Sequence, residues 1–201
     1  MTVVEEIAVK HLGRVDYAST AAAMREFTLA RGDGTVDELW LVEHPPVYTL
    51  GQGAAAVAVG NAIPVVQSDR GGEVTYHGPG QVVLYTLVDL ARRGIKVKSF
   101  VCLLEQAVID LIGARAQRKS GAPGVYVEGA KVAALGIRVT RGRAYHGLSL
   151  NVDMDLAPFN AIDPCGYPGL QVTQTRDLGI PGTPAQIGER LAQNVMRLLN
   201  A

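Results

Sequence analysis

The chain has 201 residues with 19 basic and 19 acidic side chains, so its formal net charge is zero. This length supports a single domain, 1–201, that can bury a sizeable core. Zero net charge with no basic block argues against nucleic acid or an acidic membrane as a partner, because both attract a positive field. Glycine is abundant at 23 residues, which calls for a structural reason.

The sequence also predicts a compartment. Two glutamates stand among the first ten residues where a signal peptide has basic ones, and no apolar run approaches the roughly 18 residues of a membrane span. Two cysteines, Cys102 and Cys165, are too few for a disulfide framework. We therefore expect an unexported protein of the reducing cytoplasm with no membrane partner.

The predicted elements alternate strands with three helices. In chain order they are a helix over 16–30, strands over 38–43, 47–50 and 82–88, a helix that follows Ser99 and ends near Gly113, strands over 125–127, 132–140 and 144–152, and a helix after Thr183. The last helix has the clearest start. Thr183 is a good N-cap, Pro184 suits the first helical position, and Gln186 completes a capping box.

The strands between 124 and 153 follow one another too closely for crossover helices. Glu128–Gly129 and Arg141–Gly142 therefore predict hairpin turns between antiparallel strands. The fold class predicted is α/β, with a mixed, largely antiparallel sheet flanked by helices rather than a doubly wound parallel sheet. The segment 153–176 has no periodicity and several prolines and glycines, which is typical of a functional or disordered loop.

Phosphate and metal motifs are not supported by the sequence. The run GQGAAA at 51–56 matches a dinucleotide fingerprint only superficially, because Pro64 follows before a helix of the required length. We interpret this run as a flexible loop. The chain contains no Walker A motif, HExxH or CxxC spacing, so we predict no metal site.

The two cysteines differ in their surroundings. Cys165 lies in the turn-forming sequence DPCGY, where a nucleophile or an incidental loop cysteine would both fit. Cys102 lies in a predicted helix of mostly apolar residues, and we interpret it as a small hydrophobic packing residue.

Lys131 is the more informative residue. Its alternate neighbours along the predicted strand, Ala133 and Leu135, are apolar, so its side chain points to an apolar face. Either the lysine extends back to water, or it is buried, favours its neutral form and accepts a proton from an adjacent thiol. The pattern leaves both readings open.

Four histidines, His11, His44, His77 and His146, are candidates for pairing with a cysteine. His146 alternates with apolar residues, which favours a hydrogen-bonded core histidine. His77 lies in RGGEVTYHGPGQ at 70–81, whose glycines suit close approach of the backbone to a ligand. A tight surface turn with a buried salt bridge to Arg70 is the other interpretation.

At this motif the sequence resembles a known family. RGGEVTYHGPGQ is similar to the signature of the lipoyl(octanoyl) transferases, the octanoyl-[acyl carrier protein]:protein N-octanoyltransferases. The agreement continues, in the family's order, in EHPPVYTLG (43–51), GVYVEGAKVAALGI (124–137), HGLSLNVDMDLAPFNAI (146–162) and PCG (164–166). The resemblance implies an α/β fold shared with biotin and lipoate protein ligases.

The resemblance also implies a reaction. A cysteine takes an octanoyl or lipoyl group from acyl carrier protein and passes it to a lysine of a lipoyl domain, the first step of endogenous protein lipoylation. The family's nucleophile corresponds to Cys165 and its proton-accepting lysine to Lys131. Its substrate contacts correspond to Arg70, Gly71, Gly72, Glu73, Val74, Thr75, Tyr76, His77, Ala134, Leu135, Gly136, Gly147, Leu148 and Ser149.

The implied partners are acyl carrier protein, the apo lipoyl domains of 2-oxoacid dehydrogenase subunits, and glycine cleavage H protein. No cofactor is expected, because the octanoyl group arrives on the phosphopantetheine of acyl carrier protein. A basic group at Arg92, Arg93, Lys96 and Lys98 would suit an acidic carrier, although a solvated turn explains it better.

Three other functions remain open from the sequence. An ATP-dependent lipoate or biotin protein ligase would share the fold, and a cysteine acyl hydrolase would release free octanoate. In a non-catalytic acyl-binding module, Cys165 and Lys131 would be packing residues.

Overall fold

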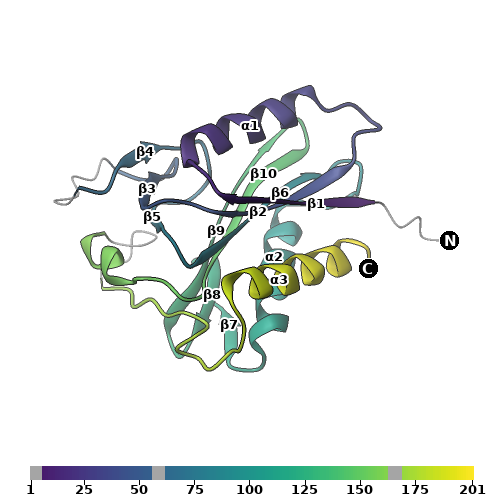
Figure 1. Ribbon diagram of the computed structural model, residues 1–201. Coiled ribbons are helices and arrows are strands. Elements are labelled where there is room, and N and C mark those ends of the chain that lie inside the picture. Colours follow the sequence, from purple (N-terminus) through teal and green to yellow (C-terminus); the bar gives the residue numbers. More distant parts are fainter. Residues whose placement is uncertain (1–5, 56–61, 163–168) are drawn as a thin grey trace.

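The computed structural model describes residues 6–55, 62–162 and 169–201. Its larger sheet has seven strands in the order β1-β2-β6-β10-β9-β8-β7, and a smaller sheet has the order β4-β3-β5 (Figure 1). The larger sheet contains β1 (Ile7–Arg14), β2 (Asp37–Glu43), β6 (Gln81–Asp89), β7 (Ala116–Arg118), β8 (Gly124–Val127), β9 (Ala130–Thr140) and β10 (Arg143–Asn151). The smaller contains β3 (Val47–Leu50), β4 (Val65–Gln67) and β5 (Val74–His77).

The larger sheet is mixed and largely antiparallel, as predicted. Only β1 and β2 run parallel in it, and every other neighbouring pair is antiparallel. Both predicted hairpin turns are confirmed. Glu128 and Gly129 have φ of 52° and 85°, and Arg141 and Gly142 have φ of 50° and 77°. Two successive positive φ angles are what a tight two-residue turn requires.

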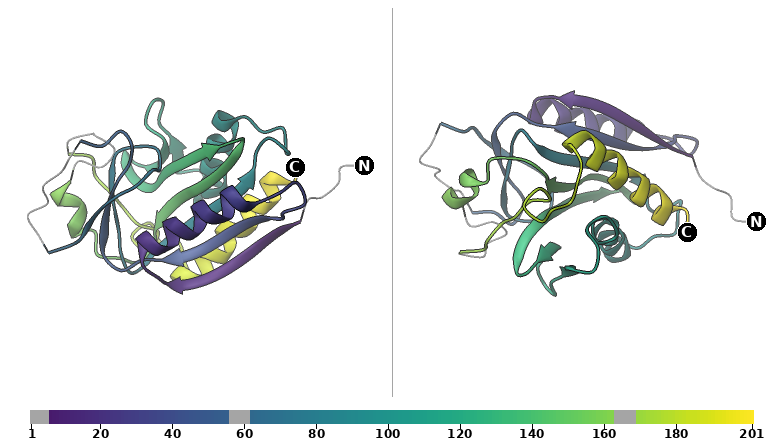
Figure 2. Two further views of the ribbon diagram at one scale, coloured as in Figure 1. Left: turned by 90° about the horizontal axis from the view of Figure 1, so that it is seen from above. Right: turned by 60° about the horizontal axis from the view of Figure 1, so that its bottom comes forward.

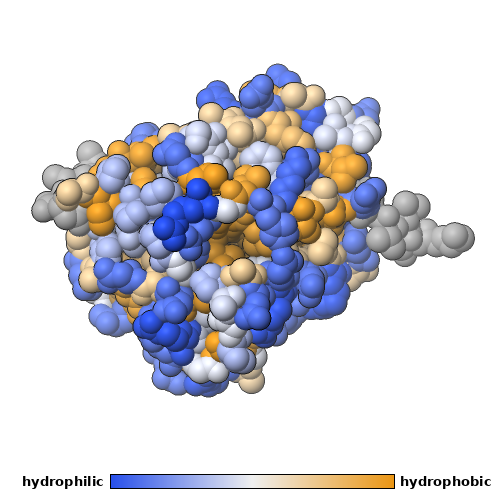
Figure 3. Space-filling model, viewed as in Figure 1, coloured by the Kyte–Doolittle hydropathy of each residue, from blue (hydrophilic) through white to orange (hydrophobic). Residues whose placement is uncertain are grey.

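Helices cover both faces of the larger sheet, because its strands alternate apolar residues on both sides (Figure 2). Helix α1 (Tyr17–Ala30) packs its Met24 on one face, against Trp40 and Val42. Helices α2 (Val97–Ile112) and α3 (Pro184–Leu199) pack on the other face, in the cluster that contains Leu39 and Leu41. On the side seen in Figure 3, hydrophobic residues gather around the middle among hydrophilic ones.

Two of the helices test the sequence predictions closely. Helix α3 has the predicted capping box: the Thr183 hydroxyl accepts from the Gln186 backbone, and the Gln186 side chain accepts from the Thr183 backbone. Helix α2 begins at Val97, three residues before the predicted start, which follows Ser99. The interpretation of Cys102 as a buried packing residue is wrong, because its side chain is exposed on α2.

The basic group near α2 has a structural role that the sequence did not reveal. The Asp37 carboxylate is fully buried and binds Arg31 at 2.5 Å, Arg92 at 2.9 Å and Arg93 at 2.6 Å. These bonds hold the pKa of Asp37 below its usual value against the opposing effect of burial. Two of the four predicted basic residues therefore stabilise the fold, and the solvated-turn interpretation is wrong for them.

The described parts of the segment 153–176, which are 153–162 and 169–176, are more ordered than their composition suggests. They contain a short 3-10 helix, η1 (Ala157–Ala161), whose Phe159 packs in an apolar cluster with Tyr48 and Tyr76. Val172 forms a parallel bridge with Lys131. Residues 163–168, including Cys165, lie outside the described residues. Across the ranges that the structure describes, no helix is both long and apolar enough to cross a membrane.

Candidate active site

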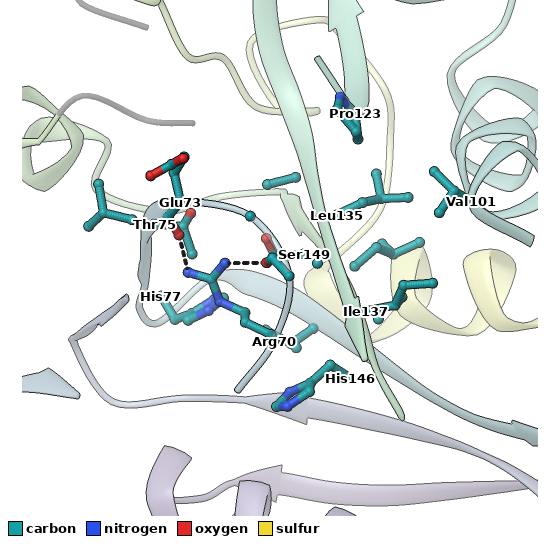
Figure 4. A pocket seen from close by; sticks show the side chains of 18 of the residues that line it. Arg70, Glu73, Thr75, His77, Val101, Pro123, Leu135, Ile137, His146 and Ser149 are labelled. Carbon is teal, nitrogen blue, oxygen red and sulfur yellow. Dashed lines mark hydrogen bonds between the residues drawn. The ribbon is translucent and has the colours of Figure 1, made fainter. Parts of the chain in front are cut away.

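A cavity of about 660 Å³ lies where the smaller sheet meets β6, β9 and β10 of the larger one (Figure 4). Every predicted substrate-contacting residue except Tyr76 lines it. The Tyr76 ring instead packs against Tyr48 and Phe159. The other lining residues are Tyr17, Val83, Tyr85, Val101, Gly121, Ala122, Pro123, Ile137 and His146.

Strand pairing explains why two separate sequence motifs share one wall. Gly136 pairs with Gly147, and Ala134 pairs with Ser149, across β9 and β10. The loop 70–73 approaches this wall closely, since the Gly71 N–H donates to the Ile137 carbonyl at 3.0 Å. A Cβ at Gly136 would lie 2.7 Å from the Gly71 carbonyl oxygen. Glycine at 136 is thus required for the loop to close over the strands.

The GQG segment supports the same loop from behind. The backbone N–H groups of Gly51, Gln52 and Gly53 donate to the carbonyls of Glu73, Arg70 and Gly72 at 3.0–3.2 Å. For its described part, 51–55, the interpretation as a flexible loop is therefore wrong. The run is a second layer of backbone that fixes the position of the 70–73 loop.

Arg70 is buried in the cavity wall, where it binds the Thr49 side chain and several backbone carbonyls. Its guanidinium donates to the Thr49 hydroxyl at 2.9 and 3.0 Å, to the Thr49 carbonyl at 2.6 Å, and to the carbonyls of Gly71 and Glu73 at 3.0 and 2.7 Å. Figure 4 shows the Arg70 guanidinium among Glu73, Thr75 and Ser149. The buried salt bridge to Arg70 that the other interpretation of this motif expected stays a prediction.

His77 is neutral, and its hydrogen bonds fix the tautomer. The Gln81 amide donates to the Tyr76 carbonyl at 3.1 Å, which leaves the Gln81 oxygen to accept from His77 Nδ1 at 2.7 Å. His77 Nε2 is then an acceptor, 3.4 Å from the Thr49 hydroxyl. Burial is the main cause that lowers the pKa of His77 to about 3.

One end of the cavity is a cluster of aromatic and imidazole rings. Tyr17 stacks on His77 with 5.8 Å between ring centroids, and His44 lies 5.8 Å from both His77 and Tyr85. His44 Nε2 and the Tyr85 hydroxyl are 2.7 Å apart, and burial raises the pKa of Tyr85 well above its usual value. Sequence reasoning missed Tyr17 and Tyr85, because they come from α1 and β6 and reach the cavity only through tertiary contacts.

His146 is a hydrogen-bonded core histidine, as predicted. Its side chain is 1% exposed, and its Nε2 lies 2.7 Å from the Asp69 carboxylate. That hydrogen bond is the largest cause that holds the pKa of Asp69 well below its usual value. Tyr145 donates to the same carboxylate, and burial together with this contact raises the pKa of Tyr145 to about 12.

Lys131 lies beside this cavity and is buried, with only 3% of its surface exposed. The alternative in which it extends to water is therefore wrong. Its Nζ donates to the Pro123 carbonyl at 3.2 Å and lies 5.1 Å from the centre of the Tyr126 ring. A smaller cavity lined by Lys131 shares Thr75, Ala134 and Ser149 with the larger one, so the lysine lies behind a wall that the two cavities have in common.

The backbone of Lys131 holds the chain that follows Cys165. Its N–H donates to the Gln171 carbonyl at 2.8 Å, and its carbonyl accepts from Thr173 at 2.9 Å. His11 lies elsewhere, exposed on β1 and 3.1 Å from Glu189. In the described ranges, no group of three or more His, Cys, Asp or Glu side chains is placed to hold a metal ion.

A family of catalytic domains and several octanoyltransferases match nearly the whole chain. The lipoyl protein ligase A/B catalytic domain matches residues 16–195. An octanoyltransferase of Azoarcus sp. (strain BH72) is 58% identical over 199 residues, covering 96% of this chain and 88% of that protein. An octanoyltransferase of Dechloromonas aromatica (strain RCB) is 57% identical over 197 residues, covering 96% of each chain.

Solved structures share the fold. A bipartite lipoate protein ligase from Thermoplasma acidophilum has a TM-score of 0.74 at 15% identity, covering 97% of this chain and 84% of that one. A biotin protein ligase from Aquifex aeolicus, in complex with biotin and ATP, has a TM-score of 0.57 at 10% identity, covering 96% and 70%. The predicted likeness to the biotin and lipoate ligase fold is confirmed.

Proposed function

This chain belongs to the lipoyl protein ligase A/B catalytic-domain family, and from that premise we propose that it is an octanoyltransferase of protein lipoylation. In this proposal an octanoyl group passes from the phosphopantetheine of acyl carrier protein to Cys165, and then to a lysine of an apo lipoyl domain. Lys131 is the proton-transfer partner of Cys165. The reaction takes place in the cytoplasm and uses no metal or ATP.

The observation that carries the proposal is a buried lysine beside a cavity lined by glycine backbone and apolar side chains. A lysine in such a place can exchange a proton with a thiol out of contact with water. Burial of an eight-carbon chain at about 0.8 kcal/mol per CH₂ contributes at most roughly 6 kcal/mol to recognition. Exclusion of water protects a thioester from hydrolysis.

The position of Lys131 also supports a pairing with Cys165. Cys165 precedes Gln171 by six residues, and the Gln171 carbonyl accepts from the Lys131 N–H. Six residues of fully extended chain span roughly 20 Å, so connectivity keeps the cysteine in the neighbourhood of the lysine. The short chain from Cys165 to Gln171 thus limits the distance between the two proposed catalytic residues.

The proposed steps balance without a further reactant. The Cys165 thiol gives its proton to Lys131 Nζ, its sulfur bonds to the octanoyl carbonyl carbon, and the bond to the phosphopantetheine sulfur breaks. Lys131 returns the proton to that leaving sulfur. The acceptor lysine amine then bonds to the same carbon, the bond to Cys165 breaks, and the amine proton passes by way of Lys131 to the cysteine sulfur.

Thioester exchange of this kind is nearly isoenergetic, and conversion of a thioester to an amide is downhill. Backbone N–H groups near Cys165 and Gly166, or in the 70–80 loop, are the proposed donors to the developing oxyanion. The proposed substrate contacts are the residues named above by resemblance. For Tyr76, the proposed contribution is to the packing behind the cavity.

Intact mass spectrometry after incubation with octanoyl-acyl carrier protein, without ATP, tests the proposal. We expect one octanoyl adduct on Cys165 that disappears when an apo lipoyl domain is added and reappears on the lipoyl domain. Cys165→Ser should show no thioester adduct. An unmodified wild-type protein, or an adduct on Cys102, would contradict the proposal.

The same assay separates the other functions. Transfer that requires ATP and survives Cys165→Ser would identify a ligase. Release of free octanoate in the presence of the lipoyl domain would identify a hydrolase. Binding of the acyl carrier without any covalent adduct would identify a binding module.

A further inference from the structure

A buried carboxylate on α2 faces the strands that carry Lys131. Glu105 is 5% exposed, and a carboxylate in such a position is costly unless both of its oxygens find donors. Its Oε1 accepts from the Gly124 N–H at 3.0 Å, and its Oε2 accepts from Arg118 Nε at 3.1 Å. Glu105 thus connects α2 to β7 and to the first residue of β8.

The bond to Gly124 leads directly to the proposed catalytic lysine. The Gly124 N–H and the Pro123 carbonyl belong to one peptide group, and that carbonyl accepts from Lys131 Nζ at 3.2 Å. In a trans peptide these two groups point in opposite directions, and no cis peptide occurs in the described ranges. The peptide therefore lies between a carboxylate on one side and the lysine amine on the other.

Such a chain of hydrogen bonds is cooperative. A negative charge at the N–H side polarises the peptide and makes its carbonyl oxygen a stronger acceptor for a cation. Low polarity around the buried carboxylate increases this effect. The arrangement strengthens the acceptor that Lys131 Nζ binds and points that amine along a fixed direction.

Gly124 fits this arrangement sterically. Its φ is +141°, and a Cβ at this position would lie 2.9 Å from Lys131 Cε and 2.7 Å from the Ala133 carbonyl. The lysine side chain therefore passes directly over the glycine. Replacement of Gly124 would displace the amine from the peptide that holds it.

We propose that Glu105 is a positioning residue for acyl transfer: through the Pro123–Gly124 peptide it orients Lys131 and stabilises its ammonium form when the cysteine thiol gives up its proton. The inference rests on the proposed function, since it needs Cys165 and Lys131 to act as a pair. Glu105 itself does not contact substrate. Gly121, Ala122 and Pro123, which line the large cavity, would be held in place by the same bond.

The test measures the reactivity of one thiol in the absence of any acyl donor. In a Cys102→Ala background, Cys165 is the only cysteine, and its alkylation by iodoacetamide at neutral pH reports how much thiolate is present. Glu105→Gln keeps the shape and one oxygen acceptor but removes the charge. A hydrogen bond to a charged group contributes about 1.5–3 kcal/mol, so we expect alkylation to slow by roughly 10- to 100-fold.

Two variants set the scale of that measurement. Lys131→Met gives the rate without the proposed proton acceptor, and Glu105→Gln should approach it. Asp110→Asn removes another carboxylate of α2, one that pairs with Arg197 at 2.5 Å on the surface, and should alkylate at the wild-type rate. In octanoyl transfer, Glu105→Gln should lower kcat by a similar factor and leave KM for the acyl carrier unchanged.

The outcomes are distinguishable. Wild-type alkylation kinetics in Glu105→Gln, or an equal loss in Asp110→Asn, would overturn the inference, as would equal rates in wild type and Lys131→Met. If alkylation depends on Glu105 and Lys131 but no octanoyl adduct forms, the proposed function fails while the positioning role stands. A thermal unfolding midpoint equal to that of Asp110→Asn shows that the rate change is not a loss of fold.

Discussion

Lys131 combines three roles at the scale of a single residue. Its side chain is buried beside the cavity, its Nζ is bound to the Pro123 carbonyl, and both of its backbone polar groups hold the segment 171–173. A lysine fixed in this way loses little additional side-chain freedom when it exchanges a proton, which favours a catalytic over a packing role.

Lys131→Ala should fold and acylate slowly. General acid–base catalysis contributes about 10²- to 10⁴-fold, and we expect the rate of octanoyl adduct formation on Cys165 to fall by a factor in this range. Stopped-time mass spectrometry measures that rate. Lys98→Ala, which removes an exposed lysine of α2, is the matched control and should behave as wild type. Wild-type rates in Lys131→Ala would remove this residue from the mechanism.

His77 gives a prediction about pH and stability. Burial lowers its pKa to about 3 from the ordinary 6.5, so below pH 6.5 the unfolded chain binds a proton that the folded chain does not. The free energy of unfolding should therefore fall as pH decreases from 6.5 toward 3, by up to about 1.4 kcal/mol per pH unit for this one group. His44, whose pKa burial also lowers, adds to the same trend.

Urea unfolding of wild type, His77→Asn and His11→Asn between pH 6.5 and 5 measures this effect. The slope of the unfolding free energy against pH should decrease in His77→Asn by up to about 1.4 kcal/mol per pH unit, which corresponds to one proton. His11→Asn, which removes an exposed histidine of β1, is the control for loss of an imidazole at the surface. Equal slopes in wild type and His77→Asn would show that His77 titrates normally in the folded protein.

The sequence predicted single residues well where one strand determined their surroundings. Alternation along β9 indicated the apolar face to which Lys131 points, and alternation along β10 indicated a buried His146. It failed for Cys102, because Val101, Leu104 and Val108 define one face of α2 and residue 102 points away from it. Tyr17 and Tyr85 reach the cavity only through tertiary contacts, which no local pattern contains.

At the scale of elements, the cavity depends on the loops 51–53 and 70–73 and on strands β9 and β10. These elements approach one another through glycines, so few side chains lie between their backbones. The 51–53 segment supports the 70–73 loop, and that loop lies on Gly136 of β9. Much of the glycine excess is explained by such contacts, because a backbone can approach another this closely only without a Cβ. The 70–73 loop packed on β9 forms one wall of the cavity.

Gly136→Ala should disturb this contact. The new Cβ would lie 2.7 Å from the Gly71 oxygen and 3.3 Å from Arg70 Cδ, so the loop must shift. We expect a loss of about 1–3 kcal/mol in the free energy of unfolding and a raised KM for the octanoyl donor. Gly34→Ala, where a Cβ meets nothing within 4 Å, is the control for urea unfolding and steady-state kinetics. Unchanged values in Gly136→Ala would mean that the loop is free to move.

Helices, strands and turns could be predicted where nearby residues form a specific pattern, and were missed where they do not. The capping box at Thr183 and both two-residue turns appear in the sequence as specific residue types at fixed positions. Strand β1 was missed because it is an exposed edge strand whose polar residues, such as Lys10 and His11, hide the alternation. Strand β5 was missed because its four residues lie inside the glycine-rich motif and read as part of a loop.

At the scale of the whole molecule, Asp37 connects parts of the chain that are far apart in sequence. It binds Arg31 after α1 together with Arg92 and Arg93 before α2. Arg93 in turn donates to the Leu199 carbonyl at the end of α3. One buried carboxylate thus links the ends of all three helices on both faces of the larger sheet.

Asp37→Asn should destabilise the protein strongly, because it leaves buried arginines without their counter-charge. Breaking a buried ion pair by removing one partner costs about 3–5 kcal/mol, which urea unfolding at neutral pH measures. Asp110→Asn breaks an exposed pair and should cost less than about 1 kcal/mol. Because the pKa of Asp37 is lowered in the folded state, its contribution should be complete above the ordinary value of 3.8 and should be lost progressively as the pH falls from there through the lowered folded-state pKa. Similar losses in both variants would contradict this role.

The bridge between Lys131 and Val172 has a consequence for how large partners use the site. Three stretches of chain, at 123–124, 131 and 171–173, meet at one residue. Backbone hydrogen bonds join Lys131 to 171–173, and its side chain donates to the Pro123 carbonyl. Hydrogen bonds of this kind keep Lys131 in one position, so it cannot move between two separate binding sites. Under the proposed function, the acyl carrier protein and the lipoyl domain must therefore each extend the reacting group to the same fixed position. They must bind one after the other, and only the acyl-enzyme connects the two half-reactions.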